Sequence, residues 1–183
     1  MSSWQTLESK TVYENPWMRV REDQVINPAG NPALYGVVEF KNRGVGIVPL
    51  HADGSITLVR QTRYATGCNS SLELPEGGCP HGENWFDTAR RELQEETGLL
   101  AEAIEPLLLG FHVSNSITNE TGALFVATGL SQAEQALEES EDITVERYPF
   151  DDVLQMVKSG IITDGYTIMG ILCLAAERSR FGL

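Results

Sequence analysis

Cysteine is scarce in this chain of 183 residues. Its three cysteines, Cys68, Cys79 and Cys173, are odd in number and lack the spacing of a metal site. Such a set argues against a disulfide framework, because paired cysteines are expected in an oxidising compartment. We therefore expect reduced thiols and a cytoplasmic protein.

Long hydrophobic runs and an excess of positive charge are also missing. No apolar run approaches the length that spans a bilayer, and the N-terminus, MSSWQTLESK, has neither a basic nor an apolar region typical of a secretion signal. Lys and Arg number 13 against 26 Asp and Glu, a net charge of −13 without a basic stripe. These absences argue against a membrane partner and against a general nucleic-acid binder.

The length of the chain fits one domain with a sizeable core and an appendage. Residues 18–26 and 34–40 are predicted strands around a dense turn signal at 27–32. A β-hairpin placed ahead of a domain is a natural dimerisation device, so we divide the chain into a β-extension, 1–42, and a main domain, 43–183. Further strands are predicted at 45–49, 56–61, 107–113, 123–127 and 143–148, with helices at 151–159 and from Thr163 or Asp164 onward.

The most informative stretch runs from Gly77 to Leu99. Asn84 followed by Asp87 is typical of an N-cap with an acidic partner, so a helix is predicted from Trp85. Gly98 has the place of the residue that follows a helix C-terminus in a left-handed conformation. One stripe of this helix is apolar and can be buried: Phe86, Ala89 and Leu93.

Three carboxylates share another face of the same helix. Glu92, Glu95 and Glu96 stand at i, i+3 and i+4, where like charges cost a few tenths of a kcal/mol per pair. A hard divalent cation held by carboxylate oxygens can offset this cost. A solvated acidic face is the alternative interpretation.

The spacing of this stretch resembles the Nudix box at every defined position: Gly77, Glu83, Arg91-Glu92-Leu93, Glu95-Glu96 and Gly98-Leu99. The resemblance implies an α/β/α sandwich with a mixed sheet. It also implies roughly two or three Mg²⁺ or Mn²⁺ ions, with Glu92, Glu96 and the backbone carbonyl of Glu76 as principal ligands. Glu95 is then a second ligand or a support for bound water, and Arg91 orients the box carboxylates, with Glu83 as a partner.

Residues before the box are similar to the ADP-ribose and nucleoside diphosphate sugar branch of the Nudix family. The run Arg60-Gln61-Thr62-Arg63-Tyr64 and the later Glu73-Leu74-Pro75 carry this similarity. Arg63 and Arg60 are candidates for binding phosphate oxygens, and Glu73 is a polar group at the edge of the site. A pair of surface arginines is the alternative. In that branch an N-terminal β-subdomain pairs two subunits, which implies a homodimer.

Trp17 follows Asn15-Pro16, which also resembles that branch, and it can stack a nucleobase. A core or interface aromatic is the other interpretation of this residue. The general base is expected on the acidic loop 138–142, with Glu141 as first choice and Glu139 as second. A solvated acidic loop would need no such role.

The resemblance implies a metal-dependent hydrolase that splits a nucleoside diphosphate sugar into a nucleoside monophosphate and a sugar phosphate. Many ADP-ribose-selective members carry a proline downstream of the box, and residues 110–121 contain none. ADP-ribose and GDP-mannose both remain candidate substrates. The alternatives are a nucleoside triphosphate or dinucleoside polyphosphate hydrolase, and a non-catalytic nucleotide-sugar sensor, although the box keeps all its carboxylates.

Overall fold

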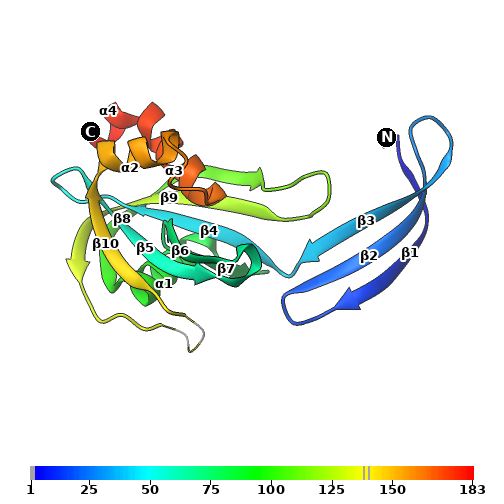
Figure 1. Ribbon diagram of the computed structural model, residues 1–183, viewed down its shortest axis with the longest axis horizontal. Helices are drawn as coiled ribbons and strands as arrows, with labels where there is room; N and C mark the ends of the chain where they lie inside the picture. The colour runs from blue at the N-terminus through cyan, green and yellow to red at the C-terminus, as the bar shows by residue number, and fades with distance from the viewer. Residues whose placement is uncertain (1–2, 138, 140) are drawn as a thin grey trace.

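The computed structural model describes residues 3–137, 139 and 141–183. They form an N-terminal arm of three strands and a body of two sheets covered by helices (Figure 1). We use the name arm for residues 3–41 and body for the described residues from 42 onward. Within the described residues, no helix has both the length and the apolar character needed to cross a bilayer.

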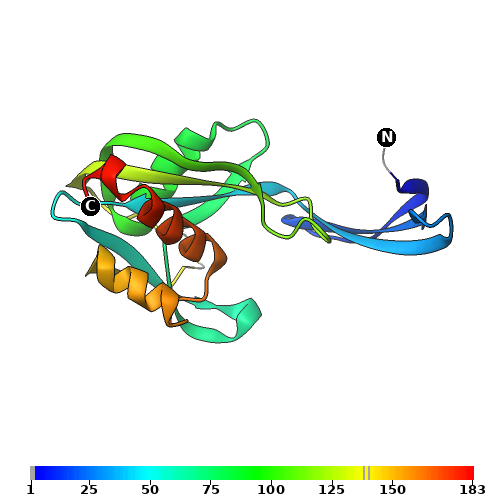
Figure 2. The ribbon, with the colours of Figure 1, turned by 90° about the horizontal axis from the view of Figure 1, so that it is seen from above.

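The arm is an antiparallel sheet in the order β1-β2-β3. Its strands are β1 (Gln5–Glu14), β2 (Met18–Ile26) and β3 (Pro32–Phe40). The expected hairpin is β2–β3, whereas β1 is an additional strand that was not predicted. Every residue of β1 is exposed, so its sequence carries no alternation of apolar and polar residues from which a strand is inferred. Figure 2 shows the arm extending away from the body.

The body contains one mixed sheet and one antiparallel sheet. The mixed sheet has the order β7-β4-β9-β8, in which β4 and β9 are parallel, and the second has the order β10-β5-β6. The strands are β4 (Asn42–Pro49), β5 (Ser55–Arg63), β6 (Cys68–Glu73), β7 (Glu76–Pro80), β8 (Leu99–His112), β9 (Thr121–Gln132) and β10 (Thr144–Pro149). A short 3₁₀ turn, η1 (Tyr64–Thr66), joins β5 to β6.

Helices cover the sheets from two sides. Helix α1 (Trp85–Thr97) packs over β4, β8 and β9, with Ala89 and Leu93 fully buried against Phe125 and its neighbours. Helices α2 (Phe150–Lys158), α3 (Gly165–Ala176) and α4 (Arg178–Phe181) lie on the other side (Figure 1). The α/β/α sandwich with a mixed sheet and an N-terminal β-extension is thus confirmed.

Strands β8 and β9 are longer than expected: β8 crosses two β-bulges and follows β9 along its whole length. Helix α3 begins next to the predicted residue, and Asp164 caps it by accepting a hydrogen bond from the Thr167 N–H. Its buried stripe includes Gly170, Ile171 and Leu174, whereas Leu172 is exposed.

The loop between β8 and β9 connects arm and body. Residues 117–119 pair with Val38 of β3, and the Asn119 side chain accepts a hydrogen bond from the Phe40 N–H. This loop therefore extends the edge of the arm sheet and holds the base of the arm against the body.

Candidate active site

Helix α1 begins and ends at the predicted residues. Asn84 caps its N-terminus by accepting a hydrogen bond from the Phe86 N–H, and Gly98 has a φ of 66° after its last turn. The apolar stripe lies on the sheet, so the carboxylate face is turned toward β7. Glu92 and Glu96 are 7% and 3% exposed, which is rare for carboxylates without a charged partner or a metal.

Arg91 is the charged partner of the box carboxylates. Its guanidinium donates to Glu92 at 2.7 Å, to Glu95 at 2.9 Å and to the Gly78 carbonyl at 3.2 Å, and lies 3.7 Å from Glu83. These contacts tie α1 to strand β7 and leave Glu96 outside the reach of Arg91. Arg91 therefore lies where the sequence predicted it, between the carboxylates that it orients.

Burial raises the pKa of Glu92 to about 7 and the pKa of Glu96 to about 8, and the nearby charge of Glu141 adds to both shifts. The Glu96 carboxylate accepts a hydrogen bond from the Glu76 N–H at 2.9 Å. Oxygen donors crowded in this way suit a hard divalent cation, which would favour their ionised forms. The donor set fits Mg²⁺ or Mn²⁺.

The close packing of β7 against the Glu92 side chain requires a glycine at position 77. A Cβ atom at this position would lie 2.1 Å from Cδ of Glu92, well inside any allowed contact. Only glycine lets β7 pass this close to the carboxylate of α1. The strand and the helix together form the oxygen-rich edge of the site.

The two candidate arginines of β5 have separate partners, although only two residues lie between them in the sequence. Arg63 donates to Glu73 and Glu76 and lines a cavity beside Gly77. Arg60 is paired with both carboxylate oxygens of Glu146, donates to Ser70 and is not among the residues that line this cavity. The structure brings only Arg63 to the box.

Glu73 lies behind Arg63. It is 1% exposed, and its carboxylate accepts hydrogen bonds from Arg63 and Gln61. Oxygen atoms of Glu73, Glu76 and Asp164 all come within 4.8 Å of one another, forming a second acidic cluster that spacing along the sequence did not indicate. Glu73 thus orients Arg63 from inside the protein.

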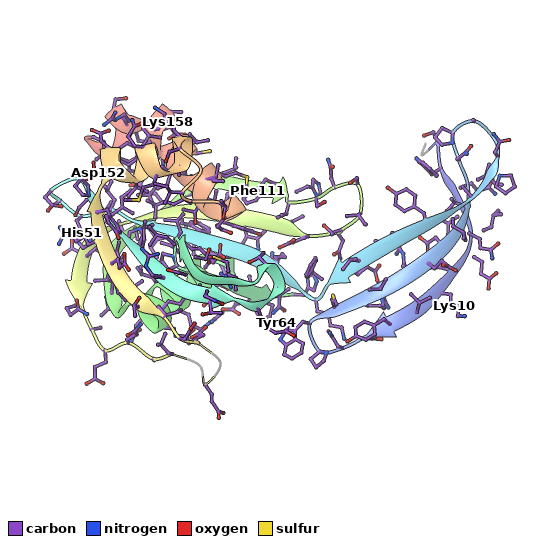
Figure 3. All side chains as sticks on the ribbon, in the orientation of Figure 1. Lys10, His51, Tyr64, Phe111, Asp152 and Lys158 are labelled. Carbon is purple, nitrogen blue, oxygen red and sulfur yellow. The ribbon has the colours of Figure 1, made fainter. Side chains whose placement is uncertain are left out.

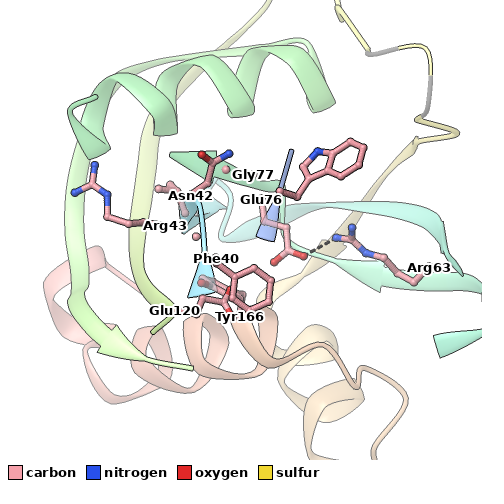
Figure 4. Close-up of a pocket in the computed structure, with 12 residues that line it drawn as sticks. Phe40, Asn42, Arg43, Arg63, Glu76, Gly77, Glu120 and Tyr166 are labelled. Atoms are coloured by element: carbon pink, nitrogen blue, oxygen red, sulfur yellow. Dashed lines mark hydrogen bonds and ion pairs between the residues drawn. The ribbon is translucent and has the colours of Figure 1, made fainter. Parts of the chain in front are cut away.

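The cavity beside the box has a volume of about 470 Å³, which is in the range of small-molecule sites. Trp17, which immediately precedes β2, is 71% exposed and contributes to its wall from the arm. The labelled residues of Figure 4 converge on the cavity from β3, β4, β5, β7, α3 and, for Glu120, the loop before β9. The polar and aromatic residues that the sequence did not single out are Phe40, Asn42, Arg43, Glu120 and Tyr166.

The acidic loop before β10 approaches the box from the other side. Its first part is fixed on the C-terminal end of α1, where the Ala136 N–H donates to the Glu95 carbonyl and the Gln135 side chain donates to the Glu96 carbonyl. At its far end Asp142 accepts hydrogen bonds from both the N–H and the hydroxyl of Thr62.

Between these anchors, Glu141 is half-buried and close enough to influence Glu92 and Glu96, whereas Glu139 is exposed. Glu138 and Ser140 of the predicted loop lie outside the described residues.

Family models match both the body and the arm of this chain. A model described as the NUDIX domain matches residues 40–164, and a model described as the nucleoside diphosphate sugar hydrolase N-terminal domain matches residues 4–38. The chain belongs to the Nudix hydrolase family. The Nudix match includes α1 and most of the residues that line the cavity, whereas Trp17 and Tyr166 of the lining lie outside it. The second match covers most of the arm.

Several proteins are similar to this Nudix hydrolase over most of its length. An ADP-ribose pyrophosphatase of Mycobacterium tuberculosis is 32% identical over 97% of this chain and 86% of its own. A methanol dehydrogenase activator of Bacillus methanolicus is 29% identical over 95% of this chain and 94% of its own. A crystal structure of an ADP compounds hydrolase has the same fold, with a TM-score of 0.87 at 20% identity, over 100% of this chain and 97% of that one.

Proposed function

We propose that this Nudix hydrolase splits the diphosphate of a nucleoside diphosphate sugar, such as ADP-ribose or GDP-mannose, into a nucleoside monophosphate and a sugar phosphate. The observation that carries the proposal is the pair of buried carboxylates, Glu92 and Glu96, which lie against β7 beside a cavity that Arg63 and Trp17 line. The match of the arm to a nucleoside diphosphate sugar hydrolase segment supports the same substrate class.

Glu92, Glu96 and the backbone carbonyl of Glu76 would hold Mg²⁺ or Mn²⁺, with Glu95 as a further ligand or support. When bound, such ions neutralise charge on the diphosphate and lower the pKa of the attacking water. Arg91 keeps Glu92 and Glu95 in place through its hydrogen bonds. The carboxylate face of α1 is therefore the end of the cavity at which the phosphates bind.

Arg63 and Trp17 supply recognition in this proposal. Arg63 is oriented by Glu73 and donates to the phosphate oxygens, a role for which the planar guanidinium is suited. Trp17 has an exposed ring at the cavity and stacks the nucleobase. Arg60, which is paired with Glu146, is assigned no contact with substrate.

Glu141 takes the proton from the attacking water. It is the residue of the acidic loop whose charge acts on Glu92 and Glu96, and the hydrogen bonds of Asp142 to Thr62 fix the chain immediately after it. Glu139 is the second candidate for this role. A carboxylate that acts as a general base typically contributes a factor of about 10² to 10⁴ to the rate.

The arm supports a homodimer in this account, with residues 1–42 as the dimerisation element and 43–183 as the hydrolase domain. A three-stranded sheet with no covered face is marginally stable alone, and the arm exposes large apolar side chains. These are Trp4, Leu7, Val12, Tyr13 and Leu34. Light scattering should give the mass of a dimer, and Leu7→Glu with Leu34→Glu should shift it to a monomer. A monomeric wild type would contradict the assignment.

The proposed activity is tested by hydrolysis of ADP-ribose, GDP-mannose, a diadenosine polyphosphate and ATP with Mg²⁺ or Mn²⁺. Glu96→Gln is the inactive variant, and Glu102→Gln, an exposed carboxylate of β8, is the matched control. Turnover of the diphosphate sugars that Glu96→Gln abolishes would support the proposal. Faster turnover of ATP or the polyphosphate would assign the alternative hydrolase activity, and tight binding without turnover would identify a sensor.

A further inference from the structure

Two buried polar atoms face the cavity without an ordinary hydrogen-bond partner among the described residues. One is Oε2 of Glu76, whose other carboxylate oxygen accepts from Arg63. The second is the hydroxyl of Tyr166, which lies beside the Glu120 carboxylate without a hydrogen bond of normal geometry. Buried polar groups in native proteins are almost always paired, so two orphans in one cavity indicate a ligand that pairs them.

Tyr166 is held in this place by the fold. A Cβ atom at Gly44 would lie 1.8 Å from its hydroxyl oxygen, and one at Gly122 would lie 2.6 Å away, so glycines on β4 and β9 make room for the ring. Phe111 packs on the ring with 5.4 Å between centroids. Strands β4 and β9 therefore fix the position of the Tyr166 hydroxyl.

The charges around these two atoms exclude a further phosphate. Glu76 and Glu120 both line this wall, as Figure 4 shows. Of the two arginines of the described lining, Arg63 is assigned to the diphosphate, and Arg43 is engaged with Cys79, the Glu83 carbonyl and the face of Trp85. A carboxylate accepts hydrogen bonds and a tyrosine hydroxyl both donates and accepts. A sugar hydroxyl is complementary to both, whereas a phosphate is repelled by the carboxylates.

We propose that Glu76 and Tyr166, with Glu120 beside them, bind the vicinal hydroxyls of a substrate ribose and so select a nucleoside diphosphate sugar over a nucleoside triphosphate. This inference rests on the proposed function of the same cavity. It assigns a specificity role to the side chain of Glu76, separate from that of its backbone carbonyl. The vicinal hydroxyls are those of the second sugar, because a nucleoside triphosphate carries the same nucleoside ribose and gives no basis for the selection.

Steady-state kinetics with ADP-ribose and ATP tests this selection in Tyr166→Phe and Glu76→Gln. Each variant should raise KM for ADP-ribose about tenfold with little change in kcat, the loss expected for one hydrogen bond to a buried partner. Tyr166→Phe should not weaken ATP hydrolysis, so its preference for ADP-ribose should fall by the same factor. Tyr64→Phe, at a tyrosine 98% exposed on η1 (Figure 3), and Glu102→Gln are the matched controls.

Inhibition by ribose 5-phosphate and by AMP then checks which sugar is bound, because the variants should weaken inhibition by ribose 5-phosphate and leave inhibition by AMP unchanged. Unchanged Mn²⁺ dependence in Glu76→Gln would separate this role from metal binding. Equal losses for ADP-ribose and ATP, or no loss for either, would overturn the inference. If Tyr166→Phe folds poorly, Glu120→Gln gives the same test. A wild type that hydrolyses no diphosphate sugar would instead overturn the proposed function.

Discussion

The arm and the body of this Nudix hydrolase use their side chains in opposite ways. The body buries two apolar clusters, one under α1 and one under α2 and α3, and buries carboxylates beside them. Among the described residues of the arm only Asp23 and Val25 are buried. Figure 3 shows the contrast, with side chains such as Lys10 standing free on the arm and those of the body packed between sheets and helices.

This difference in burial indicates that the arm and the body have different functions. A packed body can hold charged groups in costly positions, which catalysis requires, because its core stabilises the fold around them. An uncovered sheet cannot do this, but its exposed side chains are available to a substrate or a second subunit. Changes in the arm should therefore act on substrate affinity and assembly, whereas changes in the body should also act on turnover and stability.

The largest effect is expected at the general base in the body. Glu141→Gln should lower kcat about 10²- to 10⁴-fold with little change in KM, because it removes the proton acceptor and leaves the binding groups in place. Glu139→Gln, two residues away and exposed, is the matched control and should stay within about threefold of wild type. If steady-state kinetics show a larger fall in kcat for Glu139→Gln than for Glu141→Gln, Glu139 is the general base.

The next effect concerns the stability of the metal-free body. Burial raises the pKa of Glu96 to about 8 in the folded protein, from 4.5 in the unfolded chain. The folded state binds more protons between these values, so the free energy of unfolding should fall as pH rises from about 5 to 8. Glu96→Gln should remove the part of this loss that Glu96 causes and stabilise the metal-free protein at pH 8 by about 4 kcal/mol in urea titrations.

Glu22→Gln, at an exposed carboxylate of the arm, should leave the pH dependence of unfolding unchanged. A metal-free wild type that is as stable at pH 8 as at pH 5 would show that the buried carboxylate costs the body nothing.

A smaller effect separates the two arginines of β5. Arg63→Lys should raise KM about 10- to 30-fold, because lysine keeps the charge but loses the planar pair of donors. Arg60→Lys should change KM less than about twofold, since Arg60 is paired with Glu146 outside the cavity. Similar KM values for the two variants would remove the assignment of phosphate binding to Arg63.

The smallest effect is expected from the arm. Trp17→Ala should raise KM about tenfold with kcat retained, in keeping with the loss of stacking on one base. Tyr13→Ala removes a half-exposed aromatic of the arm that does not line the cavity, and should leave KM unchanged. A fall in kcat for Trp17→Ala would show that the arm contributes to the chemistry as well as to binding.

Local signals in the sequence predicted α1 completely, because its cap, its apolar stripe and its terminal glycine all lie within one short segment. They did not predict β1, whose exposed residues show no alternation, nor the short strands β6 and β7 that flank Pro75. Spacing along the chain cannot show which face of β5 carries Arg60. It also cannot show that α3 carries Tyr166 to Glu120, since only tertiary packing brings these segments together.

The most direct test of this account is Mn²⁺ binding, measured by calorimetry on wild type, Glu92→Gln, Glu96→Gln and Glu102→Gln. We expect affinity to fall at least about 100-fold in the two box variants and to remain unchanged in Glu102→Gln. Wild-type affinity in both box variants, with loss in Asp164→Asn, would place the metal in the cluster of Glu73, Glu76 and Asp164 and contradict the account.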